Sequence, residues 1–320
     1  MEKLMRAVRP ALDRLGPLQR ATPDIALLRT LIVNLYFVEV PGGWILVDAG
    51  LPGSTGAIKR QAERLFGAAR PLAIVLTHGH FDHVGGLPAL ADCWSVPVLA
   101  HRLEHPYLDG RSAYPPPDPS VGGGLMARAA PLYPRGPIDV GPHLRALPGG
   151  GTVPVMPGWR WIHTPGHTSG HVSLFRESDR TLIAGDAFIT VNQESALDVM
   201  RQRPEVSGPP AYYTQNWSAA RRSVEALLEL EPSVALTGHG LPMRGEELQR
   251  GLEALAANFE RHAVPRRGRY VGDPVLADES GPRWIPPPER RFGAVLLAGA
   301  ALLGVALAIR RMRERRGGGT

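Results

Sequence analysis

Short apolar runs alternate with amphipathic segments along the chain, and this pattern predicts the main strands and helices. Apolar residues fill 34–40 and 44–47 with Pro41-Gly42-Gly43 between them, which is typical of a β-hairpin. Residues 55–66 place apolar side chains at helical spacing and follow Ser54, which can serve as an N-cap. Further strands are predicted at 73–76, 96–100, 159–163, 172–175, 181–184 and 234–236, and further helices at 88–93, 217–230 and 245–262. Strands and helices that alternate in this way indicate an α/β layered domain.

Other stretches lack a clear strand or helix period. Residues 105–158 are interrupted by Pro-rich and Gly-rich runs, as expected of a lid, a binding loop or a disordered insert. Residues 292–309 carry no charge, and as a helix they would span roughly 27 Å, close to the thickness of the hydrocarbon layer of a bilayer. The predicted organisation is a folded domain over 1–264, a Pro/Arg-rich linker over 265–291, an apolar helix over 292–309 and a basic tail over 310–320.

The charge is unevenly distributed. The chain has a net charge of +6, but residues 261–320 hold twelve arginines and no lysine against five acidic residues, so the rest is close to neutral. A near-neutral body offers no electrostatic footprint for nucleic acid, and none is expected as a partner. No N-terminal signal peptide is visible. We therefore expect a membrane-associated protein with a cytoplasmic folded domain, in which 292–309 spans the bilayer or lies on its surface.

Candidate metal ligands follow the ends of several predicted strands. The run 77–83, THGHFDH, comes directly after the strand at 73–76. His167, Asp186 and His239 each follow a later predicted strand. Because strand ends in a layered sheet lie along one edge, these side chains can converge on a divalent metal, and Asp186 has two oxygens with which it can bridge two ions. Imidazoles and carboxylates without thiolates suit Zn²⁺, Fe²⁺ or Mn²⁺. The single cysteine, Cys93, excludes a Cys-rich zinc module.

The motif at 77–83 is followed by the pairs Gly166-His167, Gly185-Asp186 and Gly238-His239. Together they resemble the metallo-β-lactamase superfamily of metallohydrolases, over about residues 25–262. The resemblance implies an α/β (α+β) fold, a four-layer αββα sandwich with its site at the edge between the two halves. It also implies two divalent ions, with Zn²⁺ favoured and Fe or Mn as alternatives. The ligands it implies are His78, His80 and His167 for one ion, Asp82, His83 and His239 for the other, and Asp186 as the bridge.

Two adjacent cations predict a hydrolase. They acidify a bridging water to hydroxide near neutral pH, and this hydroxide can attack a carbonyl carbon. Asp82 is the expected catalytic residue, because it can orient the water and accept its proton. The run 164–171, TPGHTSGH, is similar to that of glyoxalase-II-type thioesterases and lactonases, so the expected substrate is a small thioester, lactone or other carboxylic ester. A mononuclear iron persulfide dioxygenase and a β-lactam-hydrolysing enzyme remain alternatives, and the oligomeric state stays open.

Further polar residues near these strand ends are expected to play supporting roles. His171 is expected to support the site without binding metal, and Asp48 to shape the loop under the metals by hydrogen bonds. Four residues that follow Asp186 can line a substrate pocket or simply pack in the core: Gln193, Tyr212, Tyr213 and Trp217. Surface or packing roles are expected for His101, His105, His143, His163 and His262.

Overall fold

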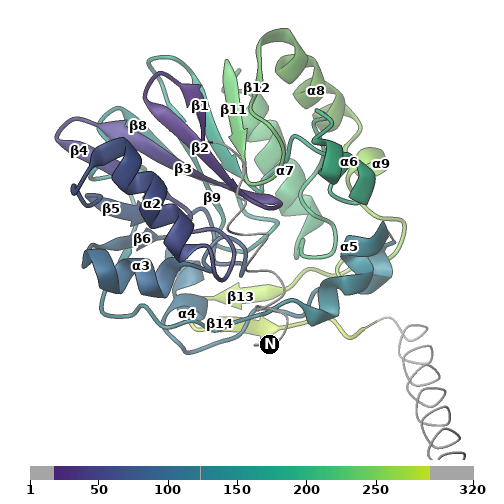
Figure 1. Cartoon of the computed structure of the whole chain (residues 1–320). Coiled ribbons are helices and arrows are strands. Elements are labelled where there is room, and N and C mark those ends of the chain that lie inside the picture. The colour runs from purple at the N-terminus through teal and green to yellow at the C-terminus, as the bar shows by residue number, and fades with distance from the viewer. Residues whose placement is uncertain (1–17, 123, 289–320) are drawn as a thin grey trace, which may run out of the picture.

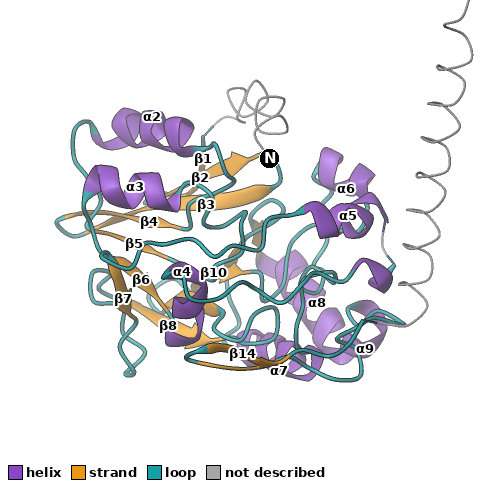
Figure 2. Ribbon diagram, turned by 90° about the horizontal axis from the view of Figure 1, so that it is seen from below, coloured by secondary structure: helices purple, strands orange, loops and turns teal. Residues whose placement is uncertain are grey.

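In the computed structural model, which describes residues 18–122 and 124–288, two β-sheets face each other and helices cover the outer face of each (Figure 1). On the first sheet lie α2 (Thr55–Phe66) and α3 (Leu87–Trp94), and on the second lie α7 (Trp217–Leu228) and α8 (Gly245–Ala257). The same layers are visible from below (Figure 2). This mixed α/β layering confirms the predicted fold class, whereas the predicted apolar helix at 292–309 lies outside the described residues.

The first sheet combines an antiparallel half with a parallel half. Its strands lie in sequence order: β1 (Gln19–Thr22), β2 (Ile25–Thr30), β3 (Val33–Val40), β4 (Gly43–Val47), β5 (Ala73–Val75), β6 (Val98–Ala100) and β7 (Leu144–Ala146). The strands from β1 to β4 pair antiparallel, and those from β4 to β7 pair parallel. Because β4, β5 and β6 run in the same direction, the loops that follow them emerge at one edge.

The second sheet supplies the other half of that edge. Its order is β12 (Met243–Arg244), β11 (Val234–Thr237), β10 (Thr181–Gly185), β9 (Val172–Arg176) and β8 (Trp159–His163). β10 and β11 are parallel, so the residues after both strands also emerge together. The remaining elements are α4 (His105–Leu108), α5 (Gly124–Ala129), α6 (Ala196–Arg201), α9 (Phe259–His262), β13 (Leu276–Asp278), β14 (Gly281–Trp284) and three 3₁₀ turns, η1 (Arg102–Glu104), η2 (Pro119–Val121) and η3 (Ala130–Leu132).

Alternation along the strands divides the apolar side chains among three buried clusters. In β4, Trp44 and Leu46 face α2 and α3, while Ile45 and Val47 face the second sheet. In β10, Leu182 faces α7 and α8, and its neighbours along the strand face the first sheet. Both sheets are therefore buried on both faces, as the apolar runs of the sequence require. Burial on both faces fixes the register of the strands, since a slip of one residue would exchange the two faces.

Hydrogen bonds between the two halves hold the functional edge together. The Asn34 side-chain amide donates to the carbonyl oxygens of Thr237 and Gly240 at 2.9 and 2.7 Å, and the Tyr36 hydroxyl donates to Thr237 O at 2.7 Å. From the second half, the Val172 N–H donates to Thr77 O at 2.9 Å. These contacts join β3 to the end of β11, and the end of β5 to the start of β9.

Some elements differ from the sequence-based prediction. The predicted helix 245–262 is divided at Asn258 into α8 and α9, and the irregular stretch 105–158 contains short helical turns and β7. Residues 265–288, expected as a linker, include the β13–β14 hairpin, and Tyr270 there is buried and donates from its hydroxyl to Pro116 O. The domain boundaries themselves stay a prediction.

The predicted membrane association is corrected by the structure. Within residues 18–122 and 124–288, no helix is both long enough and apolar enough to cross a membrane. The segment 292–309, on which the prediction depended, lies outside the described residues. The predicted cytoplasmic location is withdrawn with it, because it assumed a folded domain that this segment anchors to the membrane.

Gly85 generates a testable prediction about how the metal-motif loop is packed. A Cβ atom at this position would lie 2.0 Å from Pro52 N and 2.2 Å from Leu51 C, both of them backbone atoms that cannot move aside alone. We expect Gly85→Ala to lower the free energy of unfolding by about 1–3 kcal/mol through overpacking, measured by urea denaturation. Gly149→Ala is the control, because a Cβ there meets nothing within 4 Å. Equal stability of the two variants would contradict the packing argument.

Candidate metal centre

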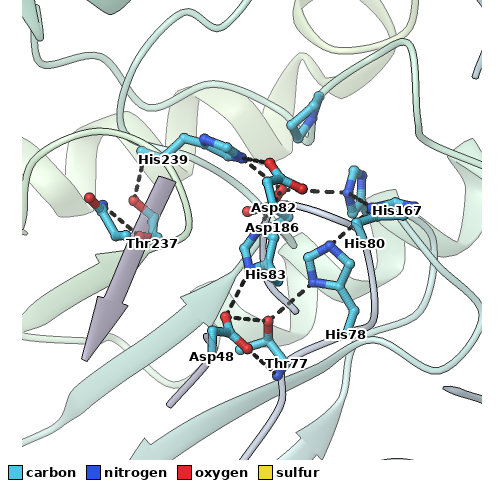
Figure 3. Close-up of polar contacts among 12 residues, drawn as sticks. Asp48, Thr77, His78, His80, Asp82, His83, His167, Asp186, Thr237 and His239 are labelled. Carbon is cyan, nitrogen blue, oxygen red and sulfur yellow. Dashed lines mark hydrogen bonds and ion pairs between the residues drawn. The ribbon is translucent and has the colours of Figure 1, made fainter. Parts of the chain in front are cut away.

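The side chains predicted to bind metal come together at the shared edge of the two sheets (Figure 3). They stand in the loops after β5, β8, β10 and β11: His78, His80, Asp82, His83, His167, Asp186 and His239. All of them are buried. Three overlapping groups of three donors have their ligand atoms within 4.8 Å of one another, and these groups contain every predicted ligand.

One group consists of imidazole nitrogens alone. His78 Nε2 lies 3.0 Å from His80 Nδ1, which in turn lies 3.0 Å from His167 Nε2. Two nitrogens bound to one tetrahedral zinc ion lie about 3.3 Å apart, given Zn–N bonds of about 2.0–2.1 Å. The spacing of these three nitrogens is thus close to that of ligands on a common ion.

The second group lies on the other side of Asp186. It contains Asp82, His83 and His239, and His239 Nε2 lies 3.6 Å from Asp82 Oδ2. Asp186 Oδ2 is 3.2 Å from His239 Nε2 in this group and 3.5 Å from His167 Nε2 in the first. The Asp186 carboxylate therefore lies between two sets of donors, where it can contact an ion on either side.

The outer nitrogens of two histidines lie within hydrogen-bond distance of oxygens that can only accept. His83 Nδ1–H donates to Asp48 Oδ2 at 2.8 Å, and His239 Nδ1–H donates to the carbonyl oxygen of Ile32 at 2.7 Å. With its proton on Nδ1, each ring turns an unprotonated Nε2 toward the cluster. His83 Nε2 is buried and has no hydrogen-bond partner within the described residues, as expected of an atom that binds a cation.

Two threonines fix the first group in the same way. The Thr77 hydroxyl donates to Asp48 Oδ2, so it accepts from His78 Nδ1 at 3.1 Å. The Thr214 hydroxyl donates to Pro210 O, so it accepts from His167 Nδ1 at 3.2 Å. His78 and His167 therefore also present lone pairs inward. The donor set fits one or two divalent cations.

The electrostatics of the cluster favour a bound cation. Burial lowers the pKa of His78 well below its ordinary value, and burial lowers that of His167 to about 4 against the opposing Asp186 charge. Burial alone would raise the pKa of Asp186, but the imidazoles of His239 and His83 outweigh it and hold this pKa well below the ordinary value. Burial alone would lower the pKa values of His83 and His239, but the Asp186 charge outweighs it and raises both, so a bound cation would displace a proton from each of these rings.

Asp48 and His171 support the metal-binding cluster by hydrogen bonds, as the sequence analysis predicted. Asp48 accepts from the Thr77 N–H at 2.8 Å in addition to the Thr77 hydroxyl and His83 (Figure 3). His171 Nε2 accepts from the Asp186 N–H at 2.9 Å, and its Nδ1 lies 2.8 Å from Thr164 Oγ1. Both ring nitrogens of His171 are thus engaged, so this histidine positions Asp186 and has no nitrogen free for an ion.

Glu104 is a structural carboxylate that the sequence analysis missed. It is fully buried at the end of η1, where Oε2 accepts from the Gly79 N–H at 2.9 Å and from the Tyr114 hydroxyl. Oε1 accepts from the Thr168 hydroxyl at 2.7 Å and from the Gly170 N–H at 2.9 Å. Glu104 thereby joins the loop of His78 and His80 to the loop of His167. The only sequence signal was an acidic residue shortly after the strand 98–100. A solvent-exposed glutamate at the same position would give the same signal, so the sequence alone did not identify a buried carboxylate.

Aromatic side chains form a wall beside the cluster. The Tyr213 ring lies 4.4 Å from the His80 ring, and Phe81 and Tyr133 lie 5.3 Å apart next to it. An apolar cavity of about 320 Å³ is lined by Phe81, Val84 and Ile138, among others. Tyr213 therefore lines the site, as one of the two sequence-based readings proposed.

The other candidates divide between the site and the core. Gln193 Nε2 lies 3.4 Å from His239 Nδ1, whereas Trp217 packs against Phe259 in the core. His163 stacks on His101 with 4.4 Å between ring centroids, and its Nε2 lies 2.9 Å from Ser169 O, away from the metal-binding groups. None of the donor groups found within the described residues includes His101, His105, His143 or His262.

The amino-acid sequence matches a known superfamily and several of its relatives. The family model of the metallo-β-lactamase superfamily matches residues 28–239. A probable metallo-hydrolase of Bacillus subtilis (strain 168), YflN, is 48% identical over 229 residues, which cover 70% of this chain and 87% of that protein. An N-acyl homoserine lactonase of Bacillus thuringiensis is 27% identical over 189 residues, which cover 52% of this chain and 65% of the lactonase.

A solved structure shares the fold. The subclass B3 metallo-β-lactamase BJP-1 of Bradyrhizobium japonicum superposes with a TM-score of 0.54, and the match covers 77% of this chain and 93% of that one. The two sequences are 22% identical. At this identity the likeness shows the fold alone.

The contacts of Asp48 predict an effect on metal affinity. The Asp48 carboxylate now accepts hydrogen bonds from Thr77 and His83. In Asp48→Asn the amide NH₂ group would face one of these donors, so the hydrogen bond that orients His83 is weakened. We expect zinc affinity to fall about 10–100-fold, measured on the full chain by competition with a chromophoric chelator. Asp92→Asn is the control, because Asp92 is exposed and pairs only with His143 at 3.4 Å. Unchanged affinity in Asp48→Asn would refute this role.

The contacts of Glu104 predict an effect on stability. A glutamine keeps one acceptor oxygen, but its NH₂ group would face two of the four donors that now point at the carboxylate. We expect Glu104→Gln to lower the free energy of unfolding by about 1–3 kcal/mol, measured by urea denaturation. In the control Glu177→Gln, which removes an exposed ion pair with Arg160, we expect a change within about 0.5 kcal/mol. A loss of similar size in both variants would show that burial of Glu104 does not matter.

Proposed function

Because the chain belongs to the metallo-β-lactamase superfamily and is a metallo-hydrolase, we propose that it is a dinuclear enzyme that hydrolyses thioesters, lactones or other carboxylic esters of small molecules. The observation that carries this proposal is the Asp186 carboxylate, whose Oδ2 lies within 3.5 Å of His167 Nε2 on one side and His239 Nε2 on the other. A carboxylate between two complete donor groups is suited to two ions, and one ion would leave half of these donors unused.

The proposed ligand sets follow the two donor groups. The imidazoles of His78, His80 and His167 would hold one ion, Asp82, His83 and His239 would hold the other, and the Asp186 carboxylate between them would be shared. Imidazole and carboxylate ligands favour Zn²⁺, with Fe or Mn as alternatives.

The chain's own residues would position and deprotonate the nucleophile. When bound, two divalent ions acidify a water shared between them to hydroxide near neutral pH and polarise the acyl carbonyl. Asp82 is the proposed proton acceptor, since its carboxylate belongs to the second donor group and burial raises its pKa against the opposing charges of His83 and His239. The aromatic rings of Phe81 and Tyr213, whose centroids lie 6.3 Å apart, would shield one side of the site from water.

Two observations support an ester-like substrate. The relative from Bacillus thuringiensis is named as an N-acyl homoserine lactonase, and a lactone is a cyclic ester. The cavity beside Phe81 has apolar walls and a volume of about 320 Å³, which suits the hydrocarbon part of an acyl group.

The test combines metal content with turnover on the full chain. We expect about two equivalents of Zn, Fe or Mn per chain after reconstitution, together with hydrolysis of at least one thioester, lactone or aryl ester from a panel that also contains a β-lactam. In Asp82→Asn we expect kcat to fall about 10²–10⁴-fold, because the proton acceptor is lost. In His163→Asn, which removes a histidine outside the donor groups, we expect both metal content and kcat to match the unaltered chain.

Other outcomes would point elsewhere. One iron per chain, with oxygen consumption on glutathione persulfide and no hydrolysis, would replace the hydrolase by the dioxygenase. Turnover of the β-lactam alone would keep the dinuclear site and change the substrate class.

A further inference from the structure

The hydroxyl of Tyr213 has no hydrogen-bond partner among the described residues, although it is buried. The residue is 5% exposed. Buried polar groups almost always find a partner, because a donor removed from water and left unpaired destabilises the protein. A phenylalanine would pack equally well at this position. The unpaired hydroxyl therefore suggests a partner that is not part of the chain.

Tyr213 stands next to the proposed reaction centre. Its ring lies 4.4 Å from the His80 ring and 6.3 Å from the Phe81 ring. Burial and then the negative charge of Asp82 raise the pKa of the hydroxyl, so it stays a neutral donor. The Tyr213 ring thus lies beside a predicted metal ligand and beside the residue that precedes the predicted proton acceptor, which are positions that a bound substrate would also approach.

The backbone around Tyr213 is held in place by the loop that carries His167. The Thr214 hydroxyl accepts from His167 Nδ1 at 3.2 Å, and the N–H groups of Gln215 and Asn216 donate to Gly166 O at 3.0 and 2.9 Å. Tyr213 N–H itself donates to Pro210 O. The position of Tyr213 is therefore fixed by the same loop that positions a metal ligand, so a donor here is already in place before substrate arrives.

We propose that Tyr213 is a catalytic residue whose hydroxyl donates a hydrogen bond to the acyl oxygen of the substrate. This inference rests on the proposed function. When the nucleophile attacks the carbonyl carbon, the C=O π bond becomes a C–O single bond and its electron pair moves to the oxygen. A neutral phenol hydroxyl binds that oxygen more strongly as its negative charge grows, and no proton is transferred.

The test compares Tyr213 with a buried tyrosine away from the site. Tyr270 is 3% exposed, and its hydroxyl donates to Pro116 O. We expect Tyr213→Phe to lower kcat about 10²–10³-fold with little change in KM, because the bond forms fully only in the transition state. We expect Tyr270→Phe to keep kcat within about twofold. Tyr213→Phe should unfold at or above the urea concentration of the unaltered chain, because it loses an unpaired polar group, whereas Tyr270→Phe should unfold at a lower one, because it loses a hydrogen bond.

A second measurement requires no turnover. Hexylboronic acid takes up hydroxide to form a tetrahedral anion that imitates the intermediate. Its affinity for the zinc-loaded full chain should fall about 10-fold in Tyr213→Phe and stay unchanged in Tyr270→Phe. Normal kcat and normal boronate affinity in Tyr213→Phe would overturn the role of Tyr213. An equal loss of kcat in both phenylalanine variants would also overturn it, since the effect would then be one of packing.

The two proposals fail in different ways. If the unaltered chain hydrolyses no ester, thioester or lactone, the proposed function fails, and the boronate affinities alone decide whether Tyr213 binds a tetrahedral oxyanion. If the unaltered chain hydrolyses an ester and Tyr213→Phe does so equally well, the proposed function stands and the inference about Tyr213 is wrong.

Discussion

The hydrogen bonds to the outer ring nitrogens of the histidines are the interaction on which the site depends. An imidazole presents a free lone pair on one nitrogen only when its proton is held on the other. Asp48 holds that proton on His83 and, through Thr77, helps to hold it on His78. The carbonyl oxygen of Ile32 does the same for His239. Three nitrogens that would otherwise compete for protons thus become a set of inward-facing ligands.

These acceptors are useful only if the two sheets keep their relative position. His239 follows β11 in the second sheet, but its partner Ile32 precedes β3 in the first. The Asn34 amide and the Tyr36 hydroxyl join the same two strands through Thr237 and Gly240. The packing of the sheets and the chemistry of the edge are therefore coupled, and a shift between the sheets would misplace the second donor group first.

Buried carboxylates at this edge divide into two kinds. Asp48 and Glu104 have their oxygens occupied by donors from the chain, and they fix loops. Asp186 Oδ1 lacks a partner within the described residues, and its Oδ2 faces histidine nitrogens from both donor groups. A buried carboxylate with unmet acceptor capacity destabilises the protein unless a cation is supplied. This contrast separates structural acids from proposed ligands by their contacts.

The sequence by itself determined the strands β3 to β6 and β8 to β11, the main helices and the predicted ligands, because apolar periodicity and the spacing in His78–His83 are local properties. It also placed His167, Asp186 and His239 after strands, which sufficed to expect convergence. Only the tertiary structure identified Glu104, since its four donors come from loops far apart in the chain, and only tertiary packing showed that the Tyr213 hydroxyl is unpaired. A local pattern records which face of an element is apolar. Whether a buried polar atom has a partner depends on residues that meet only after folding.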